Sequence, residues 1–178
     1  MKKTIVLAFL LVAGSVFGQD YTFQGLPWGS FMGDIIVQEG NYDYFSDSLL
    51  NINYVSPESR DYTIVYKNRD IAGYSANVGY TFATRTRTLI RSGYSIINIS
   101  YAHRQEVFND IINKLTIQYG NRINNLDPLL IAGGWTNVWV SNRTMISVKM
   151  YVNDISKDVT ISISYFSQGE GPNRFGDL

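Results

Sequence analysis

The stretch that decides the fold is YAHRQEVFNDIINKLTIQYG at residues 101–120, the longest segment in which apolar residues keep a helical period. A spacing near 3.6 residues gathers such residues on one stripe of a helix. The stripe consists of Val107, Phe108, Ile111, Ile112, Leu115 and Tyr119. Gly120 stands where a left-handed C-terminal cap is favoured. We therefore expect a helix that buries Ile111 and Leu115 against a sheet and leaves Asn113 in water.

Most of the remaining chain shows the period of two that is typical of β-strands. In residues 71–83, the side chains of Ala76, Val78, Tyr80 and Phe82 point one way, and small and polar side chains point the other way. This alternation indicates a sheet with one dry face and one wet face. The predicted strands comprise residues 48–55, 62–67, 71–83, 89–101, 134–141, 144–152 and 159–166. The short gaps, with turn-forming pieces such as SPESRD and KNRD, favour antiparallel hairpins.

A second, shorter helix is expected within residues 21–40, YTFQGLPWGSFMGDIIVQEG. Pro27 should end the strand-like YTFQG, because proline cannot donate a ladder hydrogen bond. Ser30 is the expected N-cap, and Gly40 should end the helix. Trp28 has two interpretations, a ligand platform or a structural plug that packs over the helix start.

These elements predict an α+β fold, an antiparallel sheet of about seven or eight strands with two helices packed on one face. Residues 19–168 form a single domain on the usual size prior. A short helix followed by strands, then a long helix followed by strands, suggests a duplicated helix-plus-sheet unit with halves at residues 19–101 and 102–168. Residues 169–178 have the composition of a flexible tail.

Residues 1–18 have the pattern of a secretory signal peptide, with Lys2 and Lys3 before a short apolar core. Cleavage is expected near Gly18, so that an exported protein, periplasmic or extracellular, begins near Gln19. The alternative is a membrane anchor, but the apolar run is shorter than the about 20 residues that a spanning helix needs. No stable membrane span is then expected after cleavage.

Composition excludes several classes of function. The formal net charge is zero, which gives no electrostatic case for binding nucleic acid. The chain has no cysteine and one histidine, His103, so disulfides, thiolate sites and multi-histidine metal sites are excluded. No recognisable nucleophile motif is present, and we expect no catalytic residue, metal or other cofactor. A carboxylate pair remains conceivable among Asp43, Asp47, Glu58 and Asp61, all of which lie in polar turn contexts.

Two clusters are candidates for binding. Trp135 and Trp139 are four residues apart on one predicted strand and hence on the same face, which suits either a recognition surface or core packing. Arg85, Arg87 and Arg91 alternate with threonines. An anion site is one interpretation of this basic cluster, and a solvated hairpin end is the other, because no Gly-rich phosphate cradle surrounds it.

A resemblance adds to these inferences. FQGLPWGSFMGDIIVQEG at residues 23–40 resembles the opening F-x-G-(Ile/Leu)-P-W-G, short helix, then Gly, of a group of small exported bacterial proteins. GYSIINISY, the helix ending in QYG, a Trp strand and the ISISY strand are similar to the second half of that group. More distantly, the repeat resembles the β-lactamase-inhibitor-protein and outer-membrane assembly lipoprotein folds, whose members bind other proteins. The chain lacks the lipidation cysteine of many exported relatives.

Two classes of function therefore remain open. The favoured one is an exported, non-catalytic binding module, protein-binding or envelope-associated, that uses the aromatic side chains of the sheet. The alternative is a cryptic carboxylate-based hydrolase or a small-ligand-binding protein. Two acids about 5 to 10 Å apart in a pocket would favour the hydrolase. An exposed apolar and aromatic surface would favour the binding module.

Overall fold

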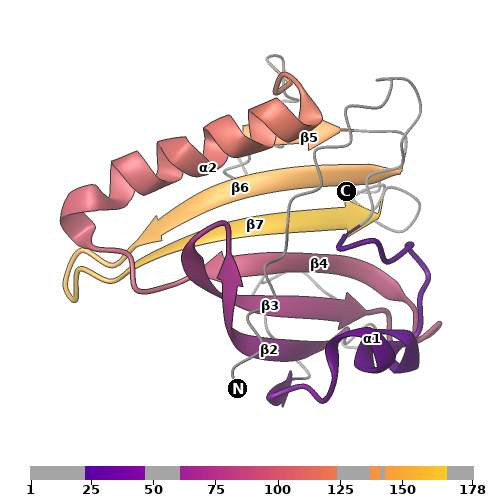
Figure 1. Cartoon of the computed structure of the whole chain (residues 1–178). Coiled ribbons are helices and arrows are strands. Elements are labelled where there is room, and N and C mark those ends of the chain that lie inside the picture. Colours follow the sequence, from indigo (N-terminus) through magenta and orange to yellow (C-terminus); the bar gives the residue numbers. More distant parts are fainter. Residues whose placement is uncertain (1–22, 47–60, 124–136, 141–142, 168–178) are drawn as a thin grey trace, which may run out of the picture.

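The computed structural model describes residues 23–46, 61–123, 137–140 and 143–167. Its elements are α1 (Met32–Glu39), β1 (Tyr44–Ser46), β2 (Tyr62–Ile71), β3 (Tyr74–Phe82), β4 (Leu89–Ile96), the 3-10 turn η1 (Tyr101–His103), α2 (Arg104–Tyr119), β5 (Asn137–Val140), β6 (Thr144–Val152) and β7 (Val159–Ser167). The seven strands form one antiparallel sheet in the order β1-β2-β3-β4-β7-β6-β5 (Figure 1). This is the predicted α+β class. The expected signal peptide at residues 1–18, strand at 48–55 and tail at 169–178 lie outside the described residues.

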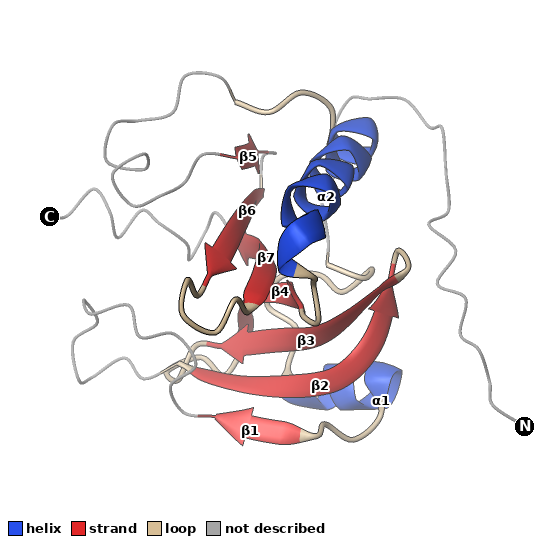
Figure 2. Ribbon diagram, turned by 90° about the vertical axis from the view of Figure 1, so that its left-hand side faces the viewer, coloured by secondary structure: helices blue, strands red, loops and turns tan. Residues whose placement is uncertain are grey.

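The long helix has the face that its sequence predicts. Ile111 and Leu115 are buried in the core, and Asn113 is exposed. Gly120 has a φ of 80°, and its amide donates to the carbonyl of Thr116 at 2.9 Å, so the helix ends at the predicted glycine. The first three residues of the predicted helix form η1 instead. Figures 1 and 2 show α2 running beside β5, β6 and β7.

The short helix begins one residue later than predicted. Its N-cap is Phe31, whose amide donates to Oδ2 of Asp34 at 2.8 Å. The Ser30 hydroxyl donates to the carbonyl of Pro27 at 2.8 Å and therefore does not cap α1, which corrects the prediction. Trp28 packs against the core and donates its indole N–H to the Thr144 hydroxyl at 2.7 Å. It thereby joins the segment before α1 to β6, in the other half of the chain.

The boundary between β2 and β3 differs from the prediction. The strands are joined by a two-residue turn at Ala72 and Gly73, whose φ values of 55° and 88° are those of a type I′ hairpin. Ile71 therefore ends β2 and does not begin β3. The KNRD piece at residues 67–70, predicted as a turn, is a register irregularity inside β2, with Asn68 at a φ of 53°.

One sheet face carries most of the hydrophobic core, to which both helices contribute. The predicted row Ala76, Val78, Tyr80 and Phe82 lies buried on this face. The other face is not wet throughout, because Thr63, Thr81, Met145 and Ser147 are also buried. The hydroxyls of Thr63 and Thr81 satisfy each other across the strands at 2.9 Å. The prediction that one face of the sheet is exposed to water is therefore wrong at these positions.

The two hairpin turns between β3 and β4 and between β6 and β7 share one hydrogen-bonded geometry. They comprise residues 83–88 and 153–158. In each, the first amide donates to the last carbonyl at 2.9 Å, and the fifth amide donates to the first carbonyl at 2.7 Å. The fifth residue, Arg87 in one turn and Lys157 in the other, has a positive φ of 58° or 61°. Equivalent backbone conformations therefore close the two hairpins.

The connections after the two helices also match. The carbonyl of Gly40, after α1, accepts a hydrogen bond from the Tyr66 hydroxyl at 2.8 Å. The carbonyl of Gly120, after α2, accepts one from the Trp139 indole at 2.9 Å. A backbone hydrogen bond of 2.9 Å follows in each half. The amide of Asp43 donates to the carbonyl of Val65, and the amide of Ile123 donates to the carbonyl of Val138. In both cases the donor lies three residues after the glycine, and the acceptor lies one residue before the aromatic side chain. The same helix-to-strand contact thus occurs in both halves of the chain.

The ladder between β4 and β7 joins these halves symmetrically. Tyr94 lies opposite Ile163, with Ser92 opposite Tyr165 on one side and Ile96 opposite Ile161 on the other. Because β4 and β7 are the last strands of equivalent hairpins, this antiparallel pairing relates the halves by an approximate two-fold axis through the ladder. The equivalent turns at residues 83–88 and 153–158 consequently lie at opposite ends of the sheet (Figure 1).

Candidate functional site

A row of aromatic rings crosses three strands at one edge of the sheet. The rings of Phe45 on β1 and Tyr62 on β2 are stacked, with centroids 5.8 Å apart and planes inclined by 27°. Tyr62 stacks in turn on Phe82 of β3, with centroids 5.1 Å apart and planes inclined by 17°. Phe82 is buried, whereas Phe45 is 45% exposed. The row therefore runs from the core to the surface and fixes the position of its outermost ring.

Exposed aromatic side chains continue around β1, the outermost described strand on this side of the sheet. Tyr42 lies with its ring centroid 6.4 Å from that of Phe45, and Tyr44 is 46% exposed. We call Tyr42, Tyr44, Phe45 and Tyr62 the aromatic edge. Large aromatic side chains held rigidly at a surface are the residues that most often anchor protein interfaces, because they bury much area at little cost in conformational entropy.

Charged groups beside the aromatic edge hold β1 against β2. The carboxylate of Asp43 accepts the backbone N–H of Lys67 at 2.8 Å. The Lys67 ammonium lies 5.9 Å from the centroid of the Tyr44 ring, within the range of a cation–π contact. One aromatic side chain of the edge therefore already has a cationic neighbour on the surface.

Beneath the segment before α1 lies a network of buried phenols. The Tyr80 hydroxyl lies 2.8 Å from Oε1 of Gln24 and 3.1 Å from Oε1 of Glu39. The amide of Gln24 donates to the Tyr94 hydroxyl at 3.1 Å. Burial, and then the charge of Glu39, raise the pKa of Tyr80 far above its usual value. Tyr80 is therefore neutral at physiological pH and acts as a structural hydrogen-bond donor.

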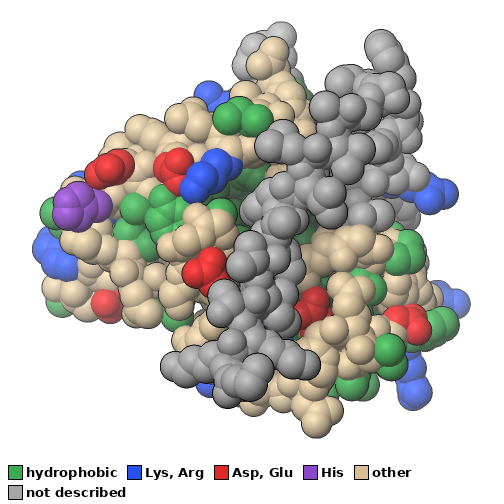
Figure 3. All heavy atoms as spheres, viewed as in Figure 1, with side chains coloured by type: hydrophobic (Ala, Val, Ile, Leu, Met, Phe, Trp, Pro, Cys, Tyr) green, Lys and Arg blue, Asp and Glu red, His purple; other side chains and the backbone are tan. Residues whose placement is uncertain are grey.

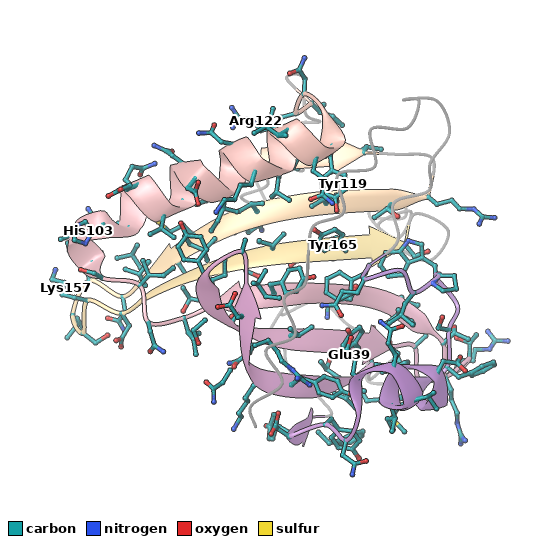
Figure 4. All side chains as sticks on the ribbon, in the orientation of Figure 1. Glu39, His103, Tyr119, Arg122, Lys157 and Tyr165 are labelled. Atoms are coloured by element: carbon teal, nitrogen blue, oxygen red, sulfur yellow. The ribbon has the colours of Figure 1, made fainter. Side chains whose placement is uncertain are left out.

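The only histidine of the sequence lies at a shallow depression between the β2–β3 turn and α2. Its lining residues are Tyr74, His103, Glu106, Val107, Asn109, Asp110 and Asn113, and Figure 4 labels His103 at this end of α2. The Tyr74 hydroxyl donates to Oδ2 of Asp110 at 2.6 Å, which raises the pKa of Tyr74 to about 12. The Lys114 ammonium, 2.7 Å from the same oxygen, and then Tyr74 hold the pKa of Asp110 below its usual value.

These contacts in the depression join the β2–β3 hairpin to α2, and the hydroxyl and the ammonium already satisfy the Asp110 carboxylate. Across the described ranges, no three or more His, Cys, Asp or Glu side chains come close enough to hold a metal ion. The arrangement therefore explains how the hairpin docks on α2.

The structure describes one of the two candidate tryptophans. Trp139 is 1% exposed, with its indole N–H bonded to Gly120, so it belongs to the core, the second of the two interpretations that the sequence left open. As a buried side chain it offers no surface to a partner. Trp135 lies outside the described residues. The aromatic edge takes the place of Trp139 as the candidate binding surface among the described residues.

The remaining candidates do not assemble into one site. Arg85 and Arg87 are exposed in the hairpin turn, whereas Arg91 on β4 is desolvated, which lowers its pKa, and contacts the ring of Phe166 at 5.8 Å. The Asp43 amide donates to the carbonyl of Val65 on β2. Asp61 precedes Val65 by four residues, which is roughly 13 Å along an extended chain. That separation exceeds the about 5 to 10 Å that glycoside hydrolysis uses. The other two acids, Asp47 and Glu58, lie outside the described residues.

The sequence carries a local signal for the aromatic edge. The residues Tyr42, Tyr44 and Phe45 follow directly on the glycine that ends α1, in the piece NYDYFS. Three aromatic residues within four positions of a short polar segment are difficult to bury together. Such a cluster is a reason to expect an exposed aromatic surface.

Comparison of the chain with family models, with curated proteins and with solved structures gives no significant match. None of the described helices has both the length and the apolar character that crossing a membrane requires. The fold and the surface together define an α+β module in which a helix-and-hairpin unit occurs twice and in which aromatic side chains are exposed at one edge of the sheet.

Proposed function

We propose that this protein is an exported, non-catalytic binding module whose partner is another protein, envelope-associated or secreted. The observation that carries the proposal is the aromatic edge, in which Tyr44 and Phe45 are each nearly half exposed although Phe45 is stacked on a row that reaches the core. Rigid, exposed aromatic side chains lose little conformational entropy when a partner covers them. They are therefore suited to be anchors of an interface.

The chemistry of the surroundings favours a protein over other macromolecules. The net charge of the sequence is zero, so no basic field supports a polyanionic partner. The aromatic edge combines apolar rings with hydroxyls and the Lys67 ammonium, the mixture that interface cores and their rims contain. The resemblance of residues 23–40 and of the repeat to exported proteins and to protein-binding folds points the same way by analogy.

Export rests on the sequence of residues 1–18, with its two lysines followed by an apolar core. Mass spectrometry of the folded protein from the producing cell checks it, since cleavage near Gly18 should leave a chain that starts near Gln19. An intact Met1 on most of the material would contradict export by this route.

Capture of envelope and secreted proteins by immobilised variants tests the binding surface. Tyr44→Ser combined with Phe45→Ser should reduce retention of the partner at least about tenfold, as expected for loss of anchor residues. Ile117→Ser is the matched control, because Ile117 on α2 is 79% exposed and lies outside the aromatic edge. Equal retention by the double variant and the wild type, with unchanged melting temperatures, would reject the aromatic edge as the binding surface.

A further inference from the structure

The two equivalent hairpin turns carry opposite charge. Residues 83–88 read ATRTRT and residues 153–158 read NDISKD. Superposition of the turns by their shared hydrogen bonds places Arg85 where the other turn has Ile155. Because one backbone conformation tolerates either residue, folding of the turn does not require an isoleucine at this position.

The acidic turn presents that isoleucine rigidly. Ile155 is 95% exposed, and its amide donates to the Asn153 side chain at 3.0 Å, as the amide of Ser156 does at 3.1 Å. The Lys157 ammonium lies 4.9 Å from the centroid of the Tyr101 ring, which directs this cation toward the body of the protein; Figure 4 labels Lys157 at this end of the molecule. A shallow depression next to the isoleucine is lined in part by Tyr151, Asp154, Ile155 and Asp158.

The basic turn has the complementary features. Arg85 and Arg87 are exposed, and the strand-like bridge between Phe31 and Thr88 places Phe31 beside this turn. Phe31 is 58% exposed. Its neighbour Asp34 carries one negative charge at this end, so the excess there is one positive charge. The acidic turn itself, with two aspartates and one lysine, has an excess of one negative charge. Beside it the Arg104 guanidinium lies 3.8 Å from the centroid of the Tyr101 ring, and Glu106 in the first turn of α2 offsets that cation.

We propose that copies of this chain associate head to tail, with the turn at residues 153–158 of one copy seated on Phe31 and the turn at residues 83–88 of the next. Ile155 contacts Phe31, and the two arginines face the depression that contains Asp154 and Asp158. The approximate two-fold axis places the two turns at opposite ends of the sheet (Figure 1), so one copy can engage both neighbours at once. Figure 3 shows basic side chains at the end of the molecule that includes α1.

This contact is heterologous, because each copy uses different surfaces for its two neighbours. Heterologous contacts that do not close into a ring give open chains whose length increases with concentration. Two small turns bury little area, so the association is weak and depends on charge. Salt at about 1 M, where the Debye length is about 3 Å, should therefore dissociate it.

Sedimentation velocity of the purified protein, over increasing concentration at low and high salt, tests the proposal. The average mass should increase with concentration at low salt and return to that of one chain at about 1 M salt. Two variants should each stay monomeric: Arg85→Asp with Arg87→Asp, and Asp154→Arg with Asp158→Arg. An equimolar mixture of the two variants should associate again, because each reversed turn then meets a turn of opposite charge.

The mixture also controls for folding. A variant that had merely misfolded would not recover association when it is mixed with the other, and Ile155→Ser should weaken association without any change of charge. A wild-type protein that stays monomeric at the highest concentration in low salt would overturn the proposal. Association that survives both charge reversals, or a mixture that stays monomeric although both variants are folded by circular dichroism, would overturn it equally.

Discussion

Trp139 donates its indole N–H to the carbonyl oxygen of Gly120 at 2.9 Å, and so joins β5, the outermost described strand on its side of the sheet, to the end of α2. The Tyr66 hydroxyl makes the same contact with Gly40 at 2.8 Å in the other half. A carbonyl at the C-terminal end of a helix has no partner within the helix, so these aromatic donors satisfy it. The indole therefore combines a core position with a specific role in helix termination.

Replacement of this indole should separate the two roles. Trp139→Ala should lower the free energy of unfolding by about 3 to 5 kcal/mol, because it leaves a large cavity in the core. Trp139→Phe keeps most of the volume and removes the donor, so a loss of about 1 to 3 kcal/mol is expected. Urea denaturation measures both, with Val140→Ala, the exposed neighbour on β5, as the control. Equal stability of Trp139→Phe and the wild type would show that the hydrogen bond contributes nothing.

The buried stripe of α2 predicts a contrast between two helix positions. Leu115→Ala should lower the free energy of unfolding by about 2 to 5 kcal/mol, since Leu115 is buried in the core. Asn113→Ala, on the exposed face, should change it by less than about 0.5 kcal/mol. Denaturant melts of the two variants decide the matter, and similar losses in both would contradict the burial of this face.

Two glycines on neighbouring strands should respond differently to an added methyl group. At Gly93 on β4 a Cβ atom would lie 2.3 Å from the carbonyl oxygen of Ile163, a backbone atom that cannot move aside freely. At Gly79 on β3 the nearest atom would be the Thr63 methyl group at 3.6 Å, an ordinary contact. Gly93→Ala should therefore destabilise the fold by about 1 to 3 kcal/mol and Gly79→Ala by much less. Thermal melts that rank the two variants in the reverse order would refute the close approach of β4 and β7.

The buried phenols predict sensitivity to alkali. Burial raises the pKa values of Tyr80, Tyr94 and Tyr165 above their usual value. A tyrosine in the unfolded chain ionises at a pKa of about 10. The folded state therefore retains protons that the unfolded state loses, so this stabilising contribution is complete below pH about 10 and is lost as the pH rises above that value.

Ultraviolet absorbance of the phenolate measures this directly. The phenolate absorbance of Tyr80, Tyr94 and Tyr165 should appear only together with unfolding, which circular dichroism follows. Tyr80→Phe removes one group that ionises only on unfolding. The free energy of unfolding of this variant should therefore fall less between neutral and alkaline pH than that of the wild type. Complete ionisation of all tyrosines in a folded protein would contradict the buried network.

Local pattern was sufficient to predict the elements with a long apolar period. The strand at residues 144–152 and the end of α2 at Gly120 agree with the structure because alternating or helical apolar residues and a capping glycine all point to the same element. The predicted β2–β3 boundary is wrong because Ala72 and Gly73 lack the usual Asn-Gly signal, while KNRD has the composition of a turn and forms an irregularity within a strand. Composition alone does not distinguish a turn from a bulge.

Local pattern indicates an aromatic cluster at residues 42–45, but it does not place that cluster at the edge of the sheet. Burial of Trp139 depends on Gly120, nineteen residues earlier, and exposure of Phe45 depends on its position at the outermost described strand. Both are consequences of sheet order, and sheet order is set by long-range pairing of β4 with β7. An aromatic residue on a strand therefore has the same local sequence signal in the core and at an exposed edge.

Photo-crosslinking in the producing cell tests the proposed binding function most directly. A photoreactive amino acid at position 44 lies within the aromatic edge, and one at position 117 lies on a more exposed part of α2. We expect position 44 to give a discrete crosslinked protein of constant mass that is absent at position 117 and is lost when Phe45→Ser is added. Identical crosslinks from both positions, or none from position 44 while the protein is folded and exported, would contradict the account of the aromatic edge as the binding surface.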